Sequence, residues 1–377
     1  MPRQDLLGVK TMKRRIISIL AVCCMMVAMM PAAFAAGTTM DETEFRNAVA
    51  QGGTVEMTGD VTLNSTLTIT SGVTIDGNGY TITYTPATKS YAFDVQINSP
   101  VVFKDLAINA TAGQSTNGIS ANYCTPDLTV DNVDIYVKRF GIALSPTGEG
   151  AKLNVLNGST IKNAKVSDYA TNVAYGDTRG ISLWDADDAV VTITNSEIKG
   201  FSYSINVVGA SLVGNSTNIS TTISNSAIWG WSAFNIWTIG NQFNIINSDL
   251  RGINAMAGGS NNFGTIVLNS GIYGSSSDSN IFNFAGGTIG AYSYGDRYQF
   301  PIEIRDELKT QFNFYKNGED YVKFVSNVNN ASFNFGTAGL TQSQIENYIS
   351  DYITGFENCD VSGLSVTNLA AAMYSAK

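Results

Sequence analysis

One short segment, Asn-Ser-x-(Ile/Leu)-x-Gly, recurs without gaps in the second half of this 377-residue chain. The copies begin at Asn195, Asn225, Asn247 and Asn269, which places them 30, 22 and 22 residues apart. Alternating apolar and polar runs, such as the one from Val191 to Thr194, precede several copies. Alternation of this kind predicts strands with one buried face. A chain that repeats strand and turn in a fixed order is constrained to stack similar units on one another.

A period near 22 residues with about three short strands in it is typical of a β-solenoid. Asparagine tolerates the left-handed backbone conformation that a tight bend between two strands requires. We therefore predict an all-β, right-handed parallel β-helix with three strands per coil, called PB1, PB2 and PB3 in chain order. The repeat predicts a structural ladder of stacked side chains at Asn195, Asn225, Asn247 and Asn269. An antiparallel β-sandwich is the alternative, although a sandwich does not require the repeat to stay in register.

Both ends of a solenoid need a cap, because an open coil exposes its core and its strand edges. At the N-terminal end, the spacing Thr39-x-x-Glu42 predicts a capping box that opens a short helix. Gly52-Gly53 then ends this helix before the first strands.

The predicted N-terminal helix, the glycine-rich stretch Gly72–Ile82 and the asparagine repeat together resemble the pectin-lyase-like superfamily of right-handed parallel β-helices. The resemblance covers roughly residues 38–290 and implies this fold. Because the superfold hosts lyases, hydrolases and non-enzymatic adhesins, the resemblance implies no single activity. We predict a β-helix with its N-terminal cap over residues 36–290. Residues 291–377 are predicted to form an α/β C-terminal cap or a small appended region, with a helix opened by the capping box Thr341-x-x-Gln344.

Residues 1–35 have the organisation of a secretory signal peptide. Lys13–Arg15 is basic, Ile16–Met30 is an almost unbroken apolar run, and Ala33-Phe-Ala35 matches a cleavage pattern. We predict cleavage after Ala35, a secreted, extracellular or cell-surface location, and no membrane span in the mature chain. An uncut anchor helix and a lipoprotein with a modified Cys23 are the alternatives.

Charge and histidine content limit the chemistry. Residues 1–35 contain five of the 22 basic and one of the 31 acidic residues, which leaves 17 basic and 30 acidic groups and a net charge of −13. An acidic surface repels phosphate backbones, so nucleic acid is not an expected partner. The sequence has no histidine, which excludes Ser-His-Asp and Cys-His catalysis and zinc sites with imidazole ligands. The sequence does not decide whether Cys124 and Cys359 form a disulfide.

Tryptophans on PB1 form the predicted ligand site. If the PB1 strands begin at residues such as Ile181, Tyr203, Phe234 and Ile253, alternation directs every second side chain outward. Trp184 and Trp237 then lie two coils apart, a separation that suits stacking on neighbouring sugar rings. Packing under a loop is the alternative for these rings. The predicted ligand-binding residues are Trp184, Trp237, Asn206, Ser182, Ser204 and Tyr175, with the segment Asn163–Arg179 as one wall.

A second group contains the candidates for catalysis. Asp187 and Asp188, together with Arg179, are the side chains that a calcium-assisted lyase or an inverting hydrolase would use. Asp185, Asp187 and Asp188 are the corresponding candidates for a metal site, with Ca²⁺ as the cofactor that a lyase would need; otherwise no cofactor is expected. Asp in short turns more often accepts hydrogen bonds from backbone groups.

A third set of outward side chains follows the asparagine turn: Lys199, Trp229, Arg251 and Tyr273 are predicted to stack on consecutive coils. An ordinary solvated face is the favoured explanation of this set.

The sequence therefore predicts a secreted or surface-associated β-helix, a non-catalytic glycan-binding or adhesin-type module whose partner is a carbohydrate or a cell surface. A neutral or weakly charged glycan is expected, because the acidic chain disfavours polyanions. A polysaccharide lyase or glycoside hydrolase acting on a plant or host polysaccharide is the alternative, and a purely structural stalk is a third.

Overall fold

A computed structural model of the chain describes residues 38–113, 116–209, 217–256, 263–269, 279–295, 298–305, 309–328, 331–336, 339–364 and 374–375. The predicted signal peptide and Tyr273 lie outside these residues. Within them, no helix is long and apolar enough to cross a membrane.

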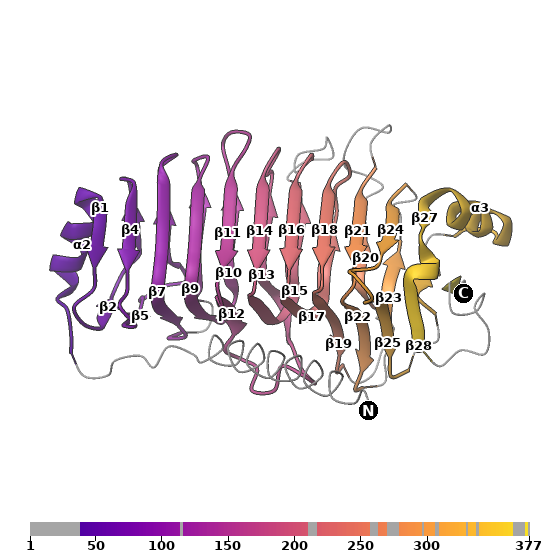
Figure 1. Ribbon diagram of the computed structural model, residues 1–377. Coiled ribbons are helices and arrows are strands. Elements are labelled where there is room, and N and C mark those ends of the chain that lie inside the picture. The colour runs from indigo at the N-terminus through magenta and orange to yellow at the C-terminus, as the bar shows by residue number, and fades with distance from the viewer. Residues whose placement is uncertain are drawn as a thin grey trace, which may run out of the picture.

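The chain forms a right-handed parallel β-helix with three strands in each coil, which confirms the predicted fold class (Figure 1). Each strand pairs in parallel with the equivalent strand of the next coil, as β1 (Gly53–Glu56) does with β4 (Val73–Asp76). Long strands turn the corners: β7 (Pro100–Ala110) and β9 (Asp127–Val137) run from PB2 into PB3, and β15 (Glu197–Val208) and β17 (Ala227–Ile236) run from PB3 into PB1.

The remaining strands fall into the same three sheets. PB1 contains β3 (Leu67–Ile69), β6 (Tyr91–Val95), β8 (Asn117–Asn122), β10 (Phe140–Ser145), β13 (Ala174–Trp184), β20 (Phe263–Leu268), β23 (Gln299–Ile304), β26 (Phe333–Asn334) and β29 (Tyr374–Ser375). PB2 contains β11 (Lys152–Leu156), β14 (Val190–Thr194), β16 (Ser220–Ser224), β18 (Gln242–Ile246), β21 (Ile281–Ala285), β24 (Gln311–Tyr315) and β27 (Ile353–Thr354). PB3 contains β2 (Val61–Leu63), β5 (Thr81–Tyr84), β12 (Thr160–Asn163), β19 (Asp249–Asn254), β22 (Thr288–Ser293), β25 (Val322–Ser326) and β28 (Cys359–Gly363).

The two α-helices of the described residues lie at opposite ends of the solenoid (Figure 1). At the N-terminal end, α2 (Glu42–Gln51) begins at Asp41, whose carboxylate accepts hydrogen bonds from the backbone N–H groups of Thr43 and Glu44. The prediction that Thr39 caps this helix is therefore wrong, because a carboxylate two residues later satisfies the free N–H groups. At the other end, α3 (Gln342–Tyr352) has the predicted capping box of Thr341 and Gln344.

Coils continue beyond residue 290. That position lies inside β22, and β23, β24 and β25 pair in register with β20, β21 and β22. The 3-10 turn η1 (Phe356–Asn358) then leads into β28, which pairs with β25. The repeat in the sequence fades here, yet pairing persists because it depends on backbone hydrogen bonds and on alternating burial.

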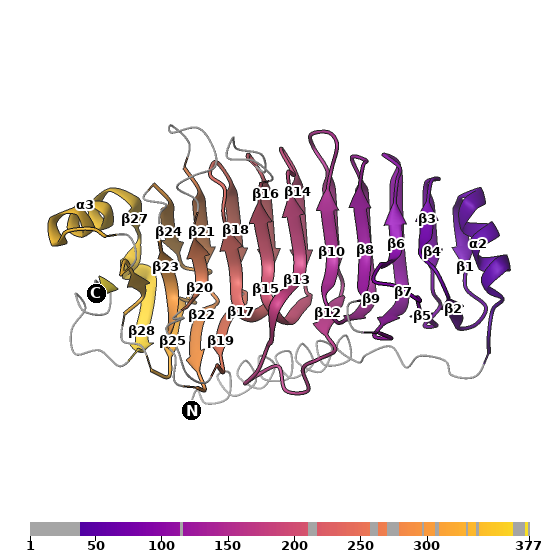
Figure 2. The ribbon, with the colours of Figure 1, turned by 180° about the vertical axis from the view of Figure 1, so that it is seen from behind.

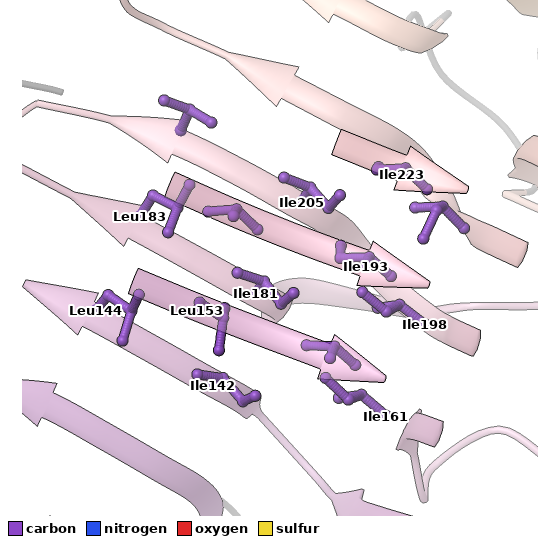
Figure 3. Close-up of a cluster of buried hydrophobic side chains, with 14 of the residues drawn as sticks. Ile142, Leu144, Leu153, Ile161, Ile181, Leu183, Ile193, Ile198, Ile205 and Ile223 are labelled. Atoms are coloured by element: carbon purple, nitrogen blue, oxygen red, sulfur yellow. The ribbon is translucent and has the colours of Figure 1, made fainter. Parts of the chain in front are cut away.

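The core is a stack of side chains from the three sheets. Its middle part is aliphatic, with Ile142, Ile181 and Ile205 in one PB1 column facing residues such as Ile193 and Ile198 (Figure 3). Phenylalanines replace these aliphatic residues towards the C-terminus, where stacked pairs are formed by Phe243, Phe282 and Phe312.

The bends between PB2 and PB3 use a left-handed residue, as the repeat predicts. Their φ angles lie between 45° and 54° at Asp105, Asn132, Asn157, Asn195, Asn225 and Asn247. The side chain of Asn247 donates to that of Asn225 at 2.9 Å, which is one bond of the predicted ladder.

One part of the ladder prediction is wrong. Asn269 follows β20 on PB1, where its side chain donates to Asn235 at 2.9 Å, so it does not belong to this column. Asn195, Asn225 and Asn247 are exposed, whereas the serines that follow these three asparagines are buried. The backbone N–H of Ser226 donates to the hydroxyl of Ser248 at 3.2 Å.

Asn225→Ala is expected to lower the free energy of unfolding by about 1–2 kcal/mol, because alanine is strained in the left-handed conformation. Asn225→Gly should cost much less, since glycine adopts this conformation freely. Thermal melts of both variants test the point. A melt of Asn225→Ala that matches the wild type would show that the turn does not depend on asparagine.

Candidate functional site

A pocket opens on the outer face of PB1, on the coils of β8, β10 and β13. These three strands lie in neighbouring coils in Figure 2. The floor of the pocket is low because the outward side chains of the central column are small: Ser120, Ala143 and Ser182 pair in register. The cavity has a volume of about 360 Å³. It is lined by Tyr91, Asn122, Tyr123, Arg139, Phe140, Ala143, Leu144, Ser145, Asp177, Arg179, Ser182 and Trp184.

One wall of this pocket is a charged network around Phe140. The guanidinium groups of Arg139 and Arg179 lie 3.9 Å and 5.1 Å from the centre of the Phe140 ring. Both pair with the carboxylate of Asp177, which is at 3.1 Å from Arg179. Arg179 also donates to the hydroxyl of Ser182 at 3.2 Å, while its buried Nε has no hydrogen-bond partner. The network is therefore held in place by the protein before any ligand binds.

Tyr91 supplies a neutral donor beside this network. Burial raises the pKa of the Tyr91 phenol to about 12, against the opposing effect of the positive charges of Arg139 and Arg179. The hydroxyl consequently keeps its proton at neutral pH.

Aromatic rings form the opposite side of the pocket. Trp184 is 38% exposed and Tyr123 is 78% exposed, although large aromatic side chains are usually covered. Trp184 pairs in register with Val208 of the next coil, and the backbone N–H of Trp237 donates to Val207. Trp237 therefore lies in the column of Trp184, two coils along, at a spacing of about 10 Å. The predicted relation between the two tryptophans agrees with this register.

The predicted starts of two PB1 strands are wrong. Arg179 pairs with Tyr203 and Ile181 with Ile205, so β15 is displaced by two residues from the predicted register. PB1 of a later coil is β20, with Ile266 in the column of Phe234, whereas Ile253 belongs to β19 of PB3.

This displacement changes the position of the polar residues that were predicted to bind the ligand. Asn206 lies in the column of Ser182 rather than that of Trp184, and it is 2% exposed. Its side-chain oxygen accepts a hydrogen bond from Asn235 at 2.7 Å. Ser204 is fully buried and donates to the backbone oxygen of Trp229. Of the predicted polar residues, the pocket thus contains Ser182 but neither Asn206 nor Ser204.

Tyr175 connects distant coils. Its hydroxyl accepts a hydrogen bond from the backbone N–H of Ala255 at 2.6 Å, and its ring packs edge-on against Trp231 at 5.6 Å. Trp231 in turn stacks on Phe263 at 4.0 Å. The segment that ends in Arg179 is therefore held across the outer face of PB1 by an aromatic cluster. Tyr175 itself lies in this cluster rather than in the pocket lining.

The aspartates after Trp184 lie in the turn between β13 and β14. Asp185 and Asp188 have left-handed φ angles of 51° and 55°. Asp187 accepts hydrogen bonds from the backbone and the hydroxyl of Thr217 at 2.8 and 3.0 Å, and Asp188 is bonded to Asn218. None of the three lines the pocket, so the structure brings Arg179 but not these carboxylates to it. Within the ranges that the structure describes, no group of three Cys, Asp or Glu residues is placed to hold a metal ion.

Sequence reasoning missed Arg139, Phe140, Tyr91 and Tyr123. The sequence contains a signal for Arg139 and Phe140. The residues just before Ile142 and just before Ile181 occupy the same corner of successive coils. Phe140 pairs with Arg179, whose backbone N–H donates to the oxygen of Arg139. Among the described residues, Cys124 and Cys359 are free thiols.

A second organised set of side chains lies on PB3. Lys199, Trp229 and Arg251 stack in register, as predicted. The charged groups of Lys199 and Arg251 lie 3.8 Å and 4.0 Å from the centre of the Trp229 ring. Glu197 and Asp249 pair with these two cations. The set satisfies its own charges, as expected of a stabilising surface network.

This network predicts a contribution to acid sensitivity. Burial alone would raise the pKa of Glu197, but hydrogen bonds and charges from Lys199 and Lys162 outweigh it and lower the pKa below 4.5. A lowered pKa stabilises the folded state above the unfolded value, and this stability is lost as the pH falls through the folded value. The advantage of the wild type over Glu197→Gln in thermal melts should therefore shrink as the pH is lowered from 7 to below 4.5.

Glu346→Gln, on the exposed surface of α3, is the control for that comparison. A difference between wild type and Glu197→Gln that does not change with pH would contradict the assigned role of Glu197.

Comparisons with known proteins were made for the whole chain. No protein-family model matches, and no curated protein matches the sequence. Among solved structures, the chain is similar to the A-module of a mannuronan C-5 epimerase from Azotobacter vinelandii. That likeness has 13% identity and a TM-score of 0.45, and covers 80% of this chain and 89% of the module. It is also similar to the Dettilon tailspike protein, with 12% identity and a TM-score of 0.42. In that case 92% of this chain and 66% of the tailspike chain are covered.

Proposed function

We propose that this protein is a secreted or surface-associated β-helix that binds a neutral or weakly charged glycan in the PB1 pocket, without catalysing its conversion. The observation that carries the proposal is the pocket itself, in which the exposed rings of Trp184 and Tyr123 face a fixed polar network. A volume of about 360 Å³ lies in the range of small-molecule sites. It is large enough to hold part of a sugar chain rather than a single ion.

Three features of the pocket match a carbohydrate. Aromatic rings stack on the apolar faces of sugars, which is the role of Trp184. The guanidinium groups of Arg139 and Arg179 and the protonated hydroxyl of Tyr91 provide donors to sugar oxygens. Asp177 compensates one of the two guanidinium groups, and Asp94 lies close enough to act on Tyr91, so the surroundings hold little net charge. A weakly charged ligand fits this balance better than a polyanion.

The same lining supports binding over turnover. A glycoside hydrolase of the common type needs two carboxyl groups on either side of the scissile bond, whereas Asp177 is the one carboxylate among the lining residues. It is paired with two arginines. A phenol whose pKa is about 12 is a poor general base at neutral pH. A lyase or hydrolase remains the second candidate, because Arg179 and Asp177 lie beside the ligand position.

The test is a glycan array probed with residues 36–377, run beside assays for reducing and unsaturated sugars. The proposal expects retention on neutral or weakly charged oligosaccharides and no product. Release of product that disappears in Asp177→Asn would overturn the non-catalytic assignment in favour of an enzyme. The same outcome with Asp187→Asn or Asp188→Asn would place the chemistry in the turn after Trp184.

A further inference from the structure

The outer face of PB2 differs from the rest of the surface between β14 and β24. The five strands β14, β16, β18, β21 and β24 alternate strictly between buried and outward residues. Each has three outward positions, and none of these positions carries Asp, Glu, Lys or Arg. All of them lie in the described part of the chain. We call these outward positions the neutral face; its strands lie side by side in the front row of Figure 1.

The neutral face is regular as well as uncharged. The four strand pairs are in uninterrupted register, so outward residues repeat about every 4.8 Å along the solenoid and roughly 6.6 Å along each strand. The central column consists of Thr192, Thr222, Asn244, Asn283 and Asn313. Within it, Asn283 donates to Asn244 and Asn313 donates to Asn283, both at 2.9 Å. These bonds fix the amides in one orientation before any partner arrives.

Charge is absent here although the chain is acidic and the same sheet is charged elsewhere. The net charge of the whole sequence is −9. On the N-terminal half of PB2, the outward positions include Lys104, Asp127, Asp131 and Lys152. An ordinary solvated strand face carries such residues, whereas the neutral face carries none across five coils.

Exposed apolar side chains occur at the margins of the neutral face. Val190 is 46% exposed, Ile246 38% and Tyr315 52%. The face therefore offers hydroxyl and amide groups in rows together with some apolar contacts. By contrast, PB1 strands such as β20 and β23 are buried on both sides.

We propose that the neutral face docks on the flat surface of an insoluble, uncharged polysaccharide. Neutral sugar chains packed side by side form a surface that matches this face. Such a surface carries no charge and presents regularly spaced hydroxyl groups with apolar ring faces between them. A charged polymer would find no counter-charge on the five strands. This site is separate from the PB1 pocket, because it lies on another sheet and shares no lining residue with it.

The experiment is a pelleting assay of residues 36–377 with microcrystalline cellulose and with crystalline chitin. Wild-type protein is expected to be retained on at least one of the two. Thr222→Lys should weaken retention roughly tenfold or more, since docking would force an ammonium group out of water. The matched control is Thr129→Lys, which makes the same change in the same column three coils away, between Asp127 and Asp131. It should be retained like the wild type.

Two further measurements distinguish this proposal from retention through the PB1 pocket and from self-association of the protein. Trp184→Ala should pellet like the wild type, whereas loss of pelleting in that variant would assign retention to the PB1 pocket and overturn the proposal. Absence of wild-type retention on both polymers, or equal retention of Thr222→Lys, would also overturn it. Sedimentation analysis covers self-association: a wild-type dimer that Thr222→Lys converts to a monomer would identify the face as an interface between copies of this chain.

Discussion

Replacing both Trp184 and Trp237 by alanine is expected to weaken glycan binding by about 30- to 1,000-fold. A lost aromatic anchor costs about 1–2 kcal/mol, and contributions from sites roughly 10 Å apart are close to additive. Trp184 lines the pocket, and Trp237 lies two coils further along the same column. Each ring would therefore contact a different sugar of one chain. Titration calorimetry with the strongest oligosaccharide from the array measures the effect.

Trp229→Ala is the control, because it removes the same kind of ring from PB3, far from the pocket lining. It should bind like the wild type even if its stability is lower. If the double variant keeps its fold, as judged by circular dichroism, and still binds with unchanged affinity, the PB1 pocket is not the glycan site.

Phe282→Ala is expected to cost about 3–5 kcal/mol of unfolding free energy, the usual range for removing a buried ring. Phe282 is fully buried and stacks between Phe243 at 4.4 Å and Phe312 at 5.5 Å. Neighbouring coils are held by parallel pairing, so the stack cannot collapse into the space that is left. Calorimetric melting should show a large drop in the transition temperature.

Tyr315→Ala, which removes a 52% exposed ring on the adjacent coil, serves as the comparison for Phe282→Ala. It should change stability by no more than about 0.5 kcal/mol. Similar losses in the two variants would mean that the stack of phenylalanines contributes little, and that pairing between strands dominates the stability of this half.

The path of the chain was predictable because its determinants are local and repeated. Each bend at positions such as Asn195, Asn225 and Asn247 needs a residue that tolerates the left-handed conformation. Each strand shows its own alternation. Likewise, the helix signals at Gly52 and at Thr341 involve only neighbouring residues. The relative position of Trp184 and Trp237 followed as well, since Ile181 and Phe234 were both placed in the right column.

The sequence by itself therefore determined the three-strand coil, its bends, the presence of a helix at each end and the tryptophan column. Only the tertiary structure decided the register of β15 and β20, and with it the placement of Asn206 and Asn269. The physical reason for β15 is that side chains alternate with a period of two, so a shift of two residues keeps every apolar residue inside and leaves no trace in the pattern. The reason for β20 and Asn269 is that alternation is the same in all three sheets and does not tell which sheet a strand joins. The pocket could not be predicted from the sequence, because Arg139, Asp177 and Arg179 meet through pairing between coils whose loops differ in length.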